Sequence, residues 1–502
     1  MNKLFKINDN DNVAIALESL AKGEKVDGIT LLDDIPFGHK VLLKDMKSGE
    51  NIIKYNEPIG HLTRDCKMGE HIHEHNLKTN LSDIVEYKFA GDNEYKPKNC
   101  EITFNGYLRD DNKAATRNEI WIIPTVGCVN NTAKRLEKIG QEIIGEGCDG
   151  VFAYTHPFGC SQLGDDQENT RKILASLANH PNAGGVLILS LGCENTNVKT
   201  FKKYLGNYNE SRIKFLVTQD CEDELEEGKK LIKELYDYVK DFKREPIPLN
   251  KLVIGYKCGG SDAFSGICAN ALCGRLTDRV TSFGTSAILT EVPEMFGAET
   301  LLMQRCKNRE TFDKCVDMIN SFKQYFFSHN QECYENPSPG NHDGGITTLE
   351  EKSLGCIQKG GKAIITDILK YGEHCKKPGL SLLTGPGNDI VSVTNLTAAG
   401  ANIILFTTGR GTPLGAPVPT VKISSNSFLY KRKSNWIDFN AGELINNRDF
   451  ENITEEILNL VIEVASGKKT KNEINSYRDI SIFKDGVITV SYTHLTLPTK
   501  RI

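Results

Sequence analysis

The stretch from Glu119 to Cys193 repeats one short pattern three times, and that pattern decides the fold. Each repeat is an apolar, β-rich run that ends in a Gly-Cys pair: Glu119-Ile-Trp-Ile-Ile-Pro-Thr-Val-Gly-Cys128, Gly150-Val-Phe-Ala-Tyr-Thr-His-Pro-Phe-Gly-Cys160 and Gly185-Val-Leu-Ile-Leu-Ser-Leu-Gly-Cys193. The cysteines stand 32 and 33 residues apart, about the length of one βα unit with its loops. A polar, helix-forming segment follows each pair, so the pattern predicts an α/β fold with a doubly wound parallel sheet.

Cys128, Cys160 and Cys193 come after the predicted strands, at equivalent positions. The carboxyl ends of parallel strands share one edge of a sheet, where ligands bind, so we expect the three thiols along one crevice. Glycine before each cysteine allows a ligand to approach the backbone closely, and a helix N-terminus lowers the pKa of a thiol. Any one of these cysteines could instead be a small buried hydrophobe; their recurrence favours a functional crevice.

Length and composition narrow the class of protein. A chain of 502 residues predicts about three domains. The net charge is −5 and no basic stripe with interleaved aromatic residues is present, so we expect neither nucleic acid nor a membrane as a partner. The 15 cysteines are spread along the chain, and Met1 to Lys6 does not begin a signal peptide, so we expect a cytoplasmic, reducing location. Apolar runs such as Val186 to Leu191 are too short to span a membrane.

Turn residues and prolines divide the chain into segments. The expected segments are a β-rich module (1–88), an α/β domain with the Gly-Cys repeats (104–245), a second α/β domain (250–490) and a tail (491–502). Short alternating runs between turns predict a β-rich module, although Asp11 to Leu20 has helical spacing. We expect a last strand at Asp479–Ile488; the tail has no periodic relation to it, and we interpret the tail as translated sequencing-adapter read-through rather than native chain.

Three alternating histidines mark the end of the predicted module, in Gly69-Glu-His-Ile-His-Glu-His-Asn76. On a strand His71, His73 and His75 would point to one face, which suits a metal ion because histidine is the commonest metal ligand. The alternative is an exposed polar strand or loop in which these side chains only form hydrogen bonds.

Strand-end loops in the second α/β domain are rich in Gly, Ser, Thr, Asn and Asp. They include Cys258-Gly-Gly-Ser-Asp262, Gly385-Pro-Gly-Asn-Asp389 and Thr408-Gly-Arg-Gly-Thr-Pro413. Such loops suit a small, polyhydroxylated anion, and we take Ser261, Asp262, Asn388 and Arg410 as candidate substrate-binding residues. None of the loops matches a dinucleotide fingerprint or a P-loop. Ordinary turn chemistry would account for any one loop alone.

From about Leu4 to Val490 the chain closely resembles the altronate/galactarate dehydratase family. The motifs that carry the resemblance are Gly69-Glu-His-Ile-His-Glu-His-Asn76, Thr79-Asn-Leu-Ser-Asp83, Arg117-Asn-Glu-Ile-Trp121, Phe158-Gly-Cys-Ser-Gln-Leu-Gly-Asp-Asp166, Leu191-Gly-Cys-Glu-Asn195, Cys258-Gly-Gly-Ser-Asp262, Thr290-Glu-Val-Pro-Glu-Met-Phe-Gly-Ala-Glu299, Glu335-Asn-Pro-Ser-Pro-Gly-Asn341, Lys352-Ser-Leu-Gly-Cys356 and Thr408-Gly-Arg-Gly-Thr-Pro413. The resemblance implies an N-terminal SAF-type β-clip module. It also implies dehydration of D-altronate to 2-dehydro-3-deoxy-D-gluconate in hexuronate (galacturonate) catabolism, with Fe²⁺ or Mn²⁺ as the metal; galactarate is the alternative substrate.

Dehydration of an aldonate removes the C2 proton beside the carboxylate and expels the C3 hydroxyl. A divalent cation at the carboxylate stabilises the doubly charged intermediate, and an acid and a base move the protons. Our hypothesis is that His71 and His73 hold the metal, with His75 as a third ligand or as the acid/base. Arg410 or Lys352 then binds the carboxylate.

Cys160, Cys193 and Glu194 complete the expected catalytic set along the crevice. This requires the N-terminal module to dock over the crevice and bring His71 near Cys160. A second reading within the enzyme class is an iron–sulfur dehydratase in which Cys128, Cys160 and Cys193 bind three irons; these cysteines lack the usual tight spacing, so we place it second. A third reading is a non-catalytic sugar-acid binding protein. The small-molecule sugar acid is the expected partner, and a homo-oligomer is left open.

Overall fold

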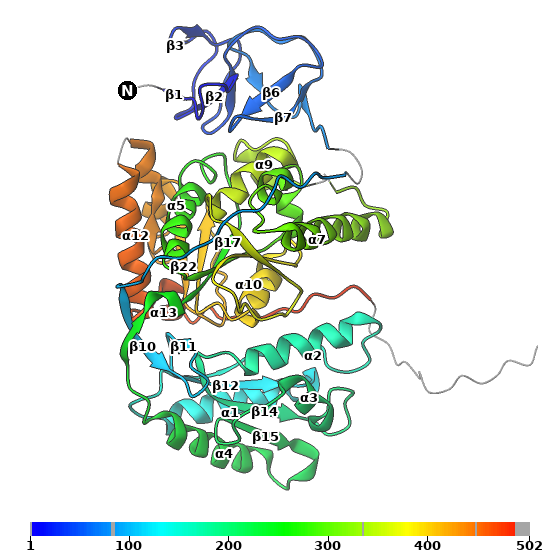
Figure 1. Cartoon of the computed structure of the whole chain (residues 1–502), viewed down its shortest axis with the longest axis vertical. Coiled ribbons are helices and arrows are strands. Elements are labelled where there is room, and N and C mark those ends of the chain that lie inside the picture. The colour runs from blue at the N-terminus through cyan, green and yellow to red at the C-terminus, as the bar shows by residue number, and fades with distance from the viewer. Residues whose placement is uncertain (1–2, 82–85, 334–335, 447–448, 487–502) are drawn as a thin grey trace, which may run out of the picture.

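The computed structural model describes residues 3–81, 86–333, 336–446 and 449–486. Three bodies stack along the long axis of the molecule (Figure 1). The N-terminal module (residues 3–81) lies at one end, the C-terminal domain (residues 249–486) in the centre, and the middle domain (residues 103–248) at the other end. The order in space therefore differs from the order along the chain.

The N-terminal module is built from short antiparallel strands. They are β1 (Leu4–Phe5), β2 (Val13–Ala16), β3 (Lys25–Val26), β4 (Ile29–Thr30), β5 (Lys40–Leu42), β6 (Asn51–Lys54), β7 (Glu57–Leu62), β8 (His71–Ile72) and β9 (Leu77–Lys78). Their sheets have the orders β1-β2-β5-β8, β6-β7-β9 and β3-β4. The helical spacing of residues 11–20 was misleading: Val13 and Ile15 pack into one hydrophobic cluster and Ala14 and Ala16 into another, so both faces of β2 are apolar and no alternation shows.

The middle domain has the predicted parallel sheet with helices on both faces. Its elements are β10 (Thr103–Leu108), β11 (Ala114–Ala115), β12 (Glu119–Pro124), α1 (Asn130–Ile143), β13 (Val151–Ala153), α2 (Asp165–Ala178), β14 (Ala183–Ser190), α3 (Val198–Leu205), β15 (Ile213–Val217), α4 (Glu224–Val239) and β16 (Glu245–Pro248). The parallel strands have the order β13-β12-β14-β15. Ile120 and Ile122 of β12 pack towards α1 and α4, whereas Trp121 and Ile123 pack towards α2 and α3. Burial on both faces explains the continuous apolar runs.

The C-terminal domain carries a larger parallel sheet with the order β19-β20-β18-β17-β21-β22-β23. Its strands are β17 (Val253–Cys258), β18 (Ser286–Leu289), β19 (Ile365–Leu369), β20 (Gly379–Leu383), β21 (Ile403–Thr408), β22 (Thr420–Ser424) and β23 (Phe439–Asn440). Its helices are α5 (Ala269–Ser282), α6 (Glu299–Met303), α7 (Arg309–Ser328), α8 (Pro339–Asp343), α9 (Leu349–Cys356), α10 (Asp389–Ala398), α11 (Ser427–Arg432), α12 (Phe450–Ala465) and α13 (Lys471–Ile474).

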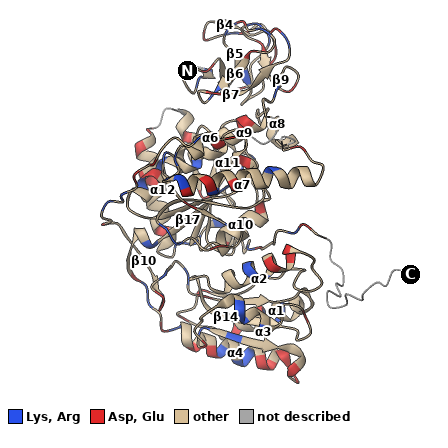
Figure 2. Ribbon diagram, turned by 45° about the vertical axis from the view of Figure 1, so that its right-hand side comes forward, with Lys and Arg blue, Asp and Glu red and all other residues tan. Residues whose placement is uncertain are grey.

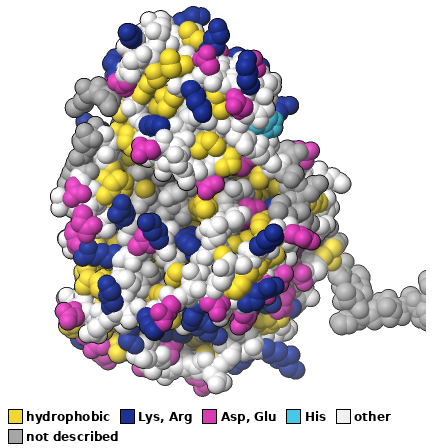
Figure 3. Space-filling view, turned by 45° about the horizontal axis from the view of Figure 1, so that its top comes forward, with side chains coloured by type: hydrophobic (Ala, Val, Ile, Leu, Met, Phe, Trp, Pro, Cys, Tyr) yellow, Lys and Arg dark blue, Asp and Glu magenta, His cyan; other side chains and the backbone are white. Residues whose placement is uncertain are grey.

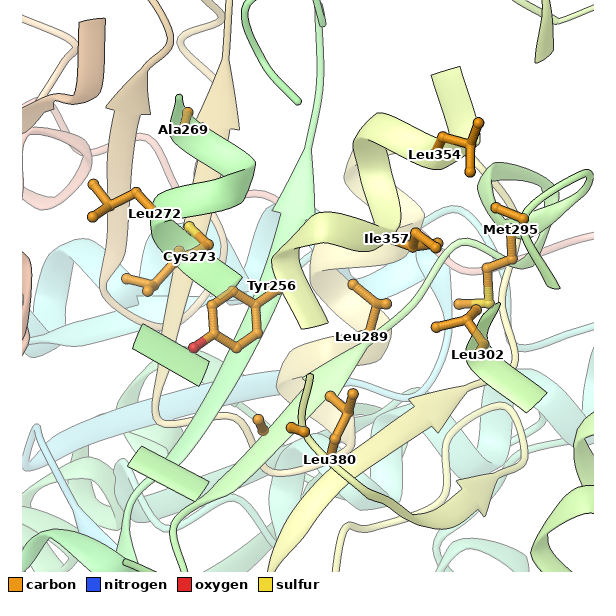
Figure 4. Close-up of a cluster of buried hydrophobic side chains, with 14 of the residues drawn as sticks. Tyr256, Ala269, Leu272, Cys273, Leu289, Met295, Leu302, Leu354, Ile357 and Leu380 are labelled. Atoms are coloured by element: carbon orange, nitrogen blue, oxygen red, sulfur yellow. The ribbon is translucent and has the colours of Figure 1, made fainter. Parts of the chain in front are cut away.

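The core of this domain confirms the predicted doubly wound α/β class. Figure 4 shows Tyr256, Leu289 and Leu380 of the sheet beside Leu272 of α5. On β21, residues 403 and 405 belong to the cluster that contains α5, whereas 404 and 406 belong to the cluster that contains α10. Helices therefore cover both faces of the sheet.

Residues 479–486 were expected to begin a last strand, but they form no strand in the described part of the chain. Ile480 and Ile482 are buried, and the backbone N–H of Phe483 donates to the Tyr371 hydroxyl. The segment is held by packing and side-chain contacts rather than by a ladder. The tail from Ser491 lies outside the described residues. No helix that the structure describes is both long and apolar enough to cross a bilayer.

Candidate functional site

The strand order of the C-terminal domain points to one crevice. β17 lies between β18 and β21, so the direction in which strands are added to the sheet reverses at β17. Open α/β sheets bind ligands at the carboxyl ends of the strands beside such a switch point. The loops after β17 and β21 meet there: the backbone N–H groups of Gly409 and Arg410 both donate to the Gly260 carbonyl at 3.0 Å. Arg410 therefore lies at the switch point.

A pocket of about 420 Å³ opens beside these loops and is closed on one side by the N-terminal module. Its lining residues are Phe37, Asp262, Phe264, Asp343, Gly344, Gly409, Arg410, Asn426 and Phe428. Phe37 of the module stacks on Phe264 of the C-terminal domain, with ring centroids 4.7 Å apart. The Arg410 side chain is 49% exposed, and its guanidinium donates to the Gly340 carbonyl at 3.2 Å. The same Nη1 lies 3.8 Å from the Asp343 carboxylate, whereas Nε and Nη2 make no hydrogen bond to the described residues and are available to an anion in the pocket.

A cluster of three histidines lies at the edge of this pocket. Nδ1 of His39 is 3.0 Å from Nε2 of His71, and one ring nitrogen from each of His39, His71 and His73 falls within 4.8 Å of the others. Nε2 of His39 is 3.4 Å from the carbonyl oxygen of Asp343, a pocket residue. The exposed ring of His75 lies 5.4 Å from that of His71, and histidine side chains reach the molecular surface in one patch (Figure 3).

The local backbone explains how the cluster forms. β8 ends at Ile72, and the next residues form a turn rather than the strand that the alternation predicted. The rings of His71 and His73 nevertheless lie 5.5 Å apart. β8 pairs antiparallel with β5, Val41 opposite His71, and this pairing places His39 next to the group. Strand pairing, not the i, i+2 alternation, builds the cluster.

These imidazoles suit a divalent cation. Burial, with the Lys40 charge adding to it, lowers the pKa of His73 to about 3; burial and the neighbouring His39 lower the pKa of His71 to about 4. Both rings are therefore neutral near pH 7, as metal ligands must be. His73, Glu74 and His342 form a second group within 4.8 Å, so a carboxylate and a histidine of α8 stand beside the first group. Mixed histidine and carboxylate ligands are the set that Fe²⁺ sites commonly use.

A buried ionic lock holds the module against the C-terminal domain. Lys40 and Lys54 of the module donate to Glu351 of α9 at 2.8 and 2.6 Å, and all three side chains are buried. Burial raises the pKa of Glu351, but the two ammonium groups outweigh it and lower the pKa to about 2. Nδ1 of His73 also lies 2.9 Å from the Thr347 hydroxyl, just before α9. The lock therefore fixes the histidines over the C-terminal domain.

Lys352, the next residue of α9, belongs to a separate buried network. Its Nζ donates to Glu294 at 3.1 Å and to Asn336 at 3.0 Å. Glu294 accepts from the Cys258 thiol at 3.0 Å, and Lys359 contacts the same sulfur at 2.8 Å. Cys258, Glu294 and Cys356 are close enough to bind a metal, but a lysine ammonium already neutralises this group, so we do not assign a metal centre here.

Two of the other predicted substrate-binding residues have their polar groups in use inside the domain. Asp262 lines the pocket, but its carboxylate accepts hydrogen bonds from Ser265, Ser425 and Asn426. Asn388 caps α10 by accepting from the Val391 N–H. Ser261 is buried beside a very small cavity of about 10 Å³ that Lys352 also lines. Arg410 and Asp262 line the pocket beside the histidine cluster, whereas Lys352 and Ser261 do not line that pocket.

In the middle domain the Gly-Cys pairs follow β12, β13 and β14, which are neighbours in the sheet, as predicted. Cys128 and Cys193 are exposed and Cys160 is half-buried. Glu194 is buried, and its carboxylate accepts from the hydroxyls of Thr125 and Ser190. The same carboxylate accepts the backbone N–H groups of Leu191 and Gly192, so it stabilises the turn after β14.

Comparisons with known proteins agree along the whole chain. Three family models match: "Altronate/galactarate dehydratase SAF domain" over residues 2–80, "D-galactarate dehydratase/Altronate hydrolase, second domain" over 106–240, and "D-galactarate/Altronate dehydratase, C-terminal" over 249–488. The altronate dehydratase of Bacillus subtilis (strain 168) is 51% identical over 500 residues, which cover 97% of this chain and 100% of the relative. The chain belongs to the altronate/galactarate dehydratase family.

Two further relatives place the chain within this dehydratase family. The altronate dehydratase of Escherichia coli (strain K12) is 48% identical over 490 residues, covering 96% of this chain and 99% of the relative. The galactarate dehydratase (L-threo-forming) of the same organism is 29% identical over 508 residues, with 97% of each chain covered. The chain is thus much more similar to the altronate dehydratases.

One expectation for the dehydratase site fails in this structure. The module docks on the C-terminal domain and not over the Gly-Cys crevice, so His71 and Cys160 lie in bodies at opposite ends of the molecule (Figures 1 and 2). The physical reason is the ionic lock: Lys40 and Lys54 are satisfied by Glu351 of α9. The linker follows the same domain, since Asn93 donates to the carbonyl of Cys306.

His39 is the residue that the sequence analysis missed. It lies in the segment Ile35-Pro-Phe-Gly-His39, whose proline and glycine indicate a turn and not a ligand site. Its only signal is that it precedes a short strand of the same module, 32 residues before His71.

Proposed function

We propose that the protein is a hydro-lyase that dehydrates D-altronate to 2-dehydro-3-deoxy-D-gluconate, a step of hexuronate catabolism. Two altronate dehydratases at 51% and 48% identity over nearly the whole chain support this substrate over galactarate. The observation that carries the proposal is the neutral histidine cluster beside the Arg410 pocket at the sheet's switch point.

The pocket offers each part of the substrate a partner. The Arg410 guanidinium has the planar fork that binds a carboxylate through two hydrogen bonds, and we assign it the sugar-acid carboxylate. Phe37, Phe264 and Phe428 give the pocket apolar walls, which pack against the carbon chain and exclude water. Polyhydroxylated ligands commonly bind through such a combination of apolar surface and few polar groups.

His39, His71 and His73 would hold the divalent cation, and we propose Fe²⁺ or Mn²⁺. Such a cation supplies Lewis acidity that stabilises negative charge developing at the substrate carboxylate. His75 lies beside His71 but outside the three-ligand group. We assign His75 the acid/base role, since histidine is the side chain that most often transfers protons in enzyme active sites.

The iron–sulfur alternative also has support, because Cys128, Cys160 and Cys193 end three neighbouring strands. It places the chemistry in the middle domain, whereas Arg410 belongs to the C-terminal domain and His39, His71 and His73 to the N-terminal module (Figure 1). Absorption spectra distinguish the two hypotheses. An iron–sulfur cluster gives a visible thiolate-to-iron charge-transfer band whose intensity scales with activity, whereas a histidine-bound ion does not.

We also propose a cytoplasmic location. The 15 cysteines are spread along the chain rather than arranged as a small disulfide framework, which fits a reducing compartment. Fractionation of the producing cells tests it, and recovery of the protein outside the cytoplasmic fraction would contradict it.

Substrate turnover tests the proposed function. Purified, metal-loaded protein should convert D-altronate to a 2-keto-3-deoxy acid, detected as the semicarbazone, at a kcat/KM at least about tenfold above that for galactarate. Binding of D-altronate without turnover, under anaerobic conditions with either metal, would instead identify a sugar-acid binding protein.

A further inference from the structure

A second and larger cavity lies away from the site described above, where the middle domain meets the C-terminal domain (Figure 1). It has a volume of about 680 Å³. The middle domain contributes loops at the amino ends of its strands, and the C-terminal domain contributes the segments before β17, β20 and β21. None of the residues assigned to the dehydratase site lines it.

The cavity is held open by contacts between the two domains. Asn402 donates to the Ala114 carbonyl at 2.9 Å, and the Thr116 hydroxyl donates to the Asn402 carbonyl at 3.2 Å. Asn182 also donates to that carbonyl, at 3.4 Å. These buried amides fix the floor of the cavity, so a ligand would enter a site that is already formed and would not bear the cost of ordering it.

Two arginines in the wall carry charge that no acidic group neutralises directly. The Arg109 guanidinium donates to the Pro181 and Arg117 carbonyls and to Asn118, and Arg212 donates to carbonyls before and at the start of β14. Neither arginine forms a salt bridge within the described ranges of the chain. Burial, with the Arg212 charge next, lowers the pKa of Arg109 to about 10. Asp110 and Asp111 also line the cavity and lie near Arg212, but five lysine and arginine side chains line it with them, so positive potential remains in the cavity.

The rim of the cavity adds to this potential. Lys376 is exposed and makes no hydrogen bond or ion pair among the residues that the structure describes, whereas Lys113 pairs with Asp111 at 2.6 Å and Lys251 donates to Asn112 at 2.9 Å. Asp110 at the rim accepts from the Tyr238 hydroxyl. Burial and the charges of Lys113 and Lys376 lower the pKa of the neighbouring His374 to about 4. Cations therefore outnumber carboxylates around the opening.

Neutral donors complete the lining. Asn207 and Tyr208 line the cavity beside the cationic groups, and amides and phenols of this kind pair with ligand hydroxyls. A small inorganic ion would leave most of a 680 Å³ cavity unfilled, whereas cavities of about 300–1,000 Å³ are typical of organic ligands.

We propose that this interdomain cavity is a second ligand site, which binds a small polyhydroxylated anion of the sugar-acid or sugar-phosphate class. The anion lies against the Arg109 and Arg212 wall, with Lys113 and Lys376 at the mouth. Because the site is separate from Arg410 and the histidine cluster, ligand binding here does not depend on the catalytic pocket.

Titration calorimetry on the full-length protein tests this inference. The probes are D-gluconate for the carboxylate class, 6-phospho-D-gluconate for the phosphate class, and inorganic phosphate for charge alone. We expect saturable binding of one of the two organic probes at one site per chain; which of them binds more tightly identifies the anionic group. Arg410→Ala should leave this binding unchanged, because it alters only the other pocket.

Charge-reversal variants at the exposed mouth locate the site without disturbing the buried wall. Lys113→Glu and Lys376→Glu should each weaken the affinity by about tenfold, the factor that one charge-assisted hydrogen bond carries. Lys229→Glu, at an exposed position on α4, is the matched control and should have no effect. The inference is overturned if neither organic probe binds below millimolar concentration, if both mouth variants bind like the wild type, or if Arg410→Ala abolishes binding.

Discussion

At the residue scale, the candidate metal site depends on keeping three imidazoles neutral and close together. Burial and the charge of Lys40 keep the rings of His71 and His73 neutral. The pairing of β5 with β8 brings His39 close to them. Replacing any one of these histidines should therefore lower the affinity for the metal without unfolding the module, because the module's apolar core is formed by other residues.

We predict that His39→Ala lowers both bound metal and turnover. Loss of groups that only support a ligand costs about 10- to 100-fold, so loss of a direct ligand should cost at least that. His61→Ala is the matched control, since His61 is a histidine of the same module that contacts Asn80 at 2.8 Å. Metal analysis and rate measurements on both variants check this, and a His39→Ala protein with full metal and full rate would remove His39 from the site.

We predict that Arg410→Ala raises the KM for D-altronate by about tenfold or more, since it removes a charge-assisted contact with the carboxylate. Bound metal should be unchanged, because Arg410 is not part of the histidine cluster. Arg432→Ala, at an exposed position of α11, serves as the control. Steady-state kinetics with parallel metal analysis separate the two effects; an unchanged KM would show that the carboxylate binds elsewhere.

The sequence predicts some residues of the candidate site and misses others. His71 and His73 are visible as a local pattern, and Arg410 follows from its loop after a strand. His39 is not visible, because only tertiary strand pairing brings it to His71. Asp262 and Asn388 have the right residue types and loops, yet the domain's own hydrogen bonds use their side chains; sequence patterns do not show whether a polar group is already satisfied.

At the element scale, α9 connects the parts of the site. Glu351 on one face pairs with Lys40 and Lys54 of the module, and Lys352 on another face enters the buried network with Glu294. The helical spacing of residues 11–20 did not predict β2 correctly. Both faces of this strand are buried and apolar, so its sequence lacks the alternation of a half-exposed strand. The polar, helix-forming segment after Cys160, by contrast, forms a helix as predicted, α2.

We predict that Glu351→Ala releases the module from the C-terminal domain. It leaves two buried ammonium groups unpaired, which costs about 3–5 kcal/mol when one partner of a buried pair is removed. Asp65→Ala is the control, because the Lys47–Asp65 pair is exposed and such pairs contribute at most about 1 kcal/mol. Denaturant unfolding with limited proteolysis at the linker reports the difference; equal midpoints for the two variants would refute the lock.

At the scale of the whole molecule, the stacking order of the three bodies controls which motifs can act together. The sequence predicted both parallel sheets and their ligand edges, but not which sheet the module covers. That choice depends on complementary buried charges far apart in the chain, such as Lys54 and Glu351, and on the linker path. The histidines therefore lie beside the Arg410 pocket, and not beside the Gly-Cys crevice.

Two buried histidines of the middle domain predict how stability depends on pH. Burial lowers the pKa of His156 to about 4 and of His180 to about 3. Each ring donates from Nε2 to a carbonyl and accepts a backbone N–H at Nδ1, which requires the neutral form. Below about pH 6.5 the unfolded rings bind protons and the native rings do not, so stability falls as the pH drops towards 4, by up to about 1.4 kcal/mol per pH unit for each histidine.

Denaturant midpoints measured from pH 7 to pH 4.5 check this slope. His180→Gln should flatten it relative to the wild type, while His329→Gln, an exposed histidine, should not. A slope identical in the His180→Gln and wild-type proteins would contradict the assignment.

The proposed reaction requires a divalent ion held by His39, His71 and His73. The most direct test of this requirement is product formation from D-altronate by exhaustively chelated wild-type protein, titrated anaerobically with Fe²⁺ or Mn²⁺ and without sulfide. We predict no activity in the metal-free protein and recovery that saturates at about one ion per chain, since the cluster offers a single set of three imidazoles. Full activity without metal, or recovery only with added sulfide and a visible charge-transfer band, would contradict this requirement.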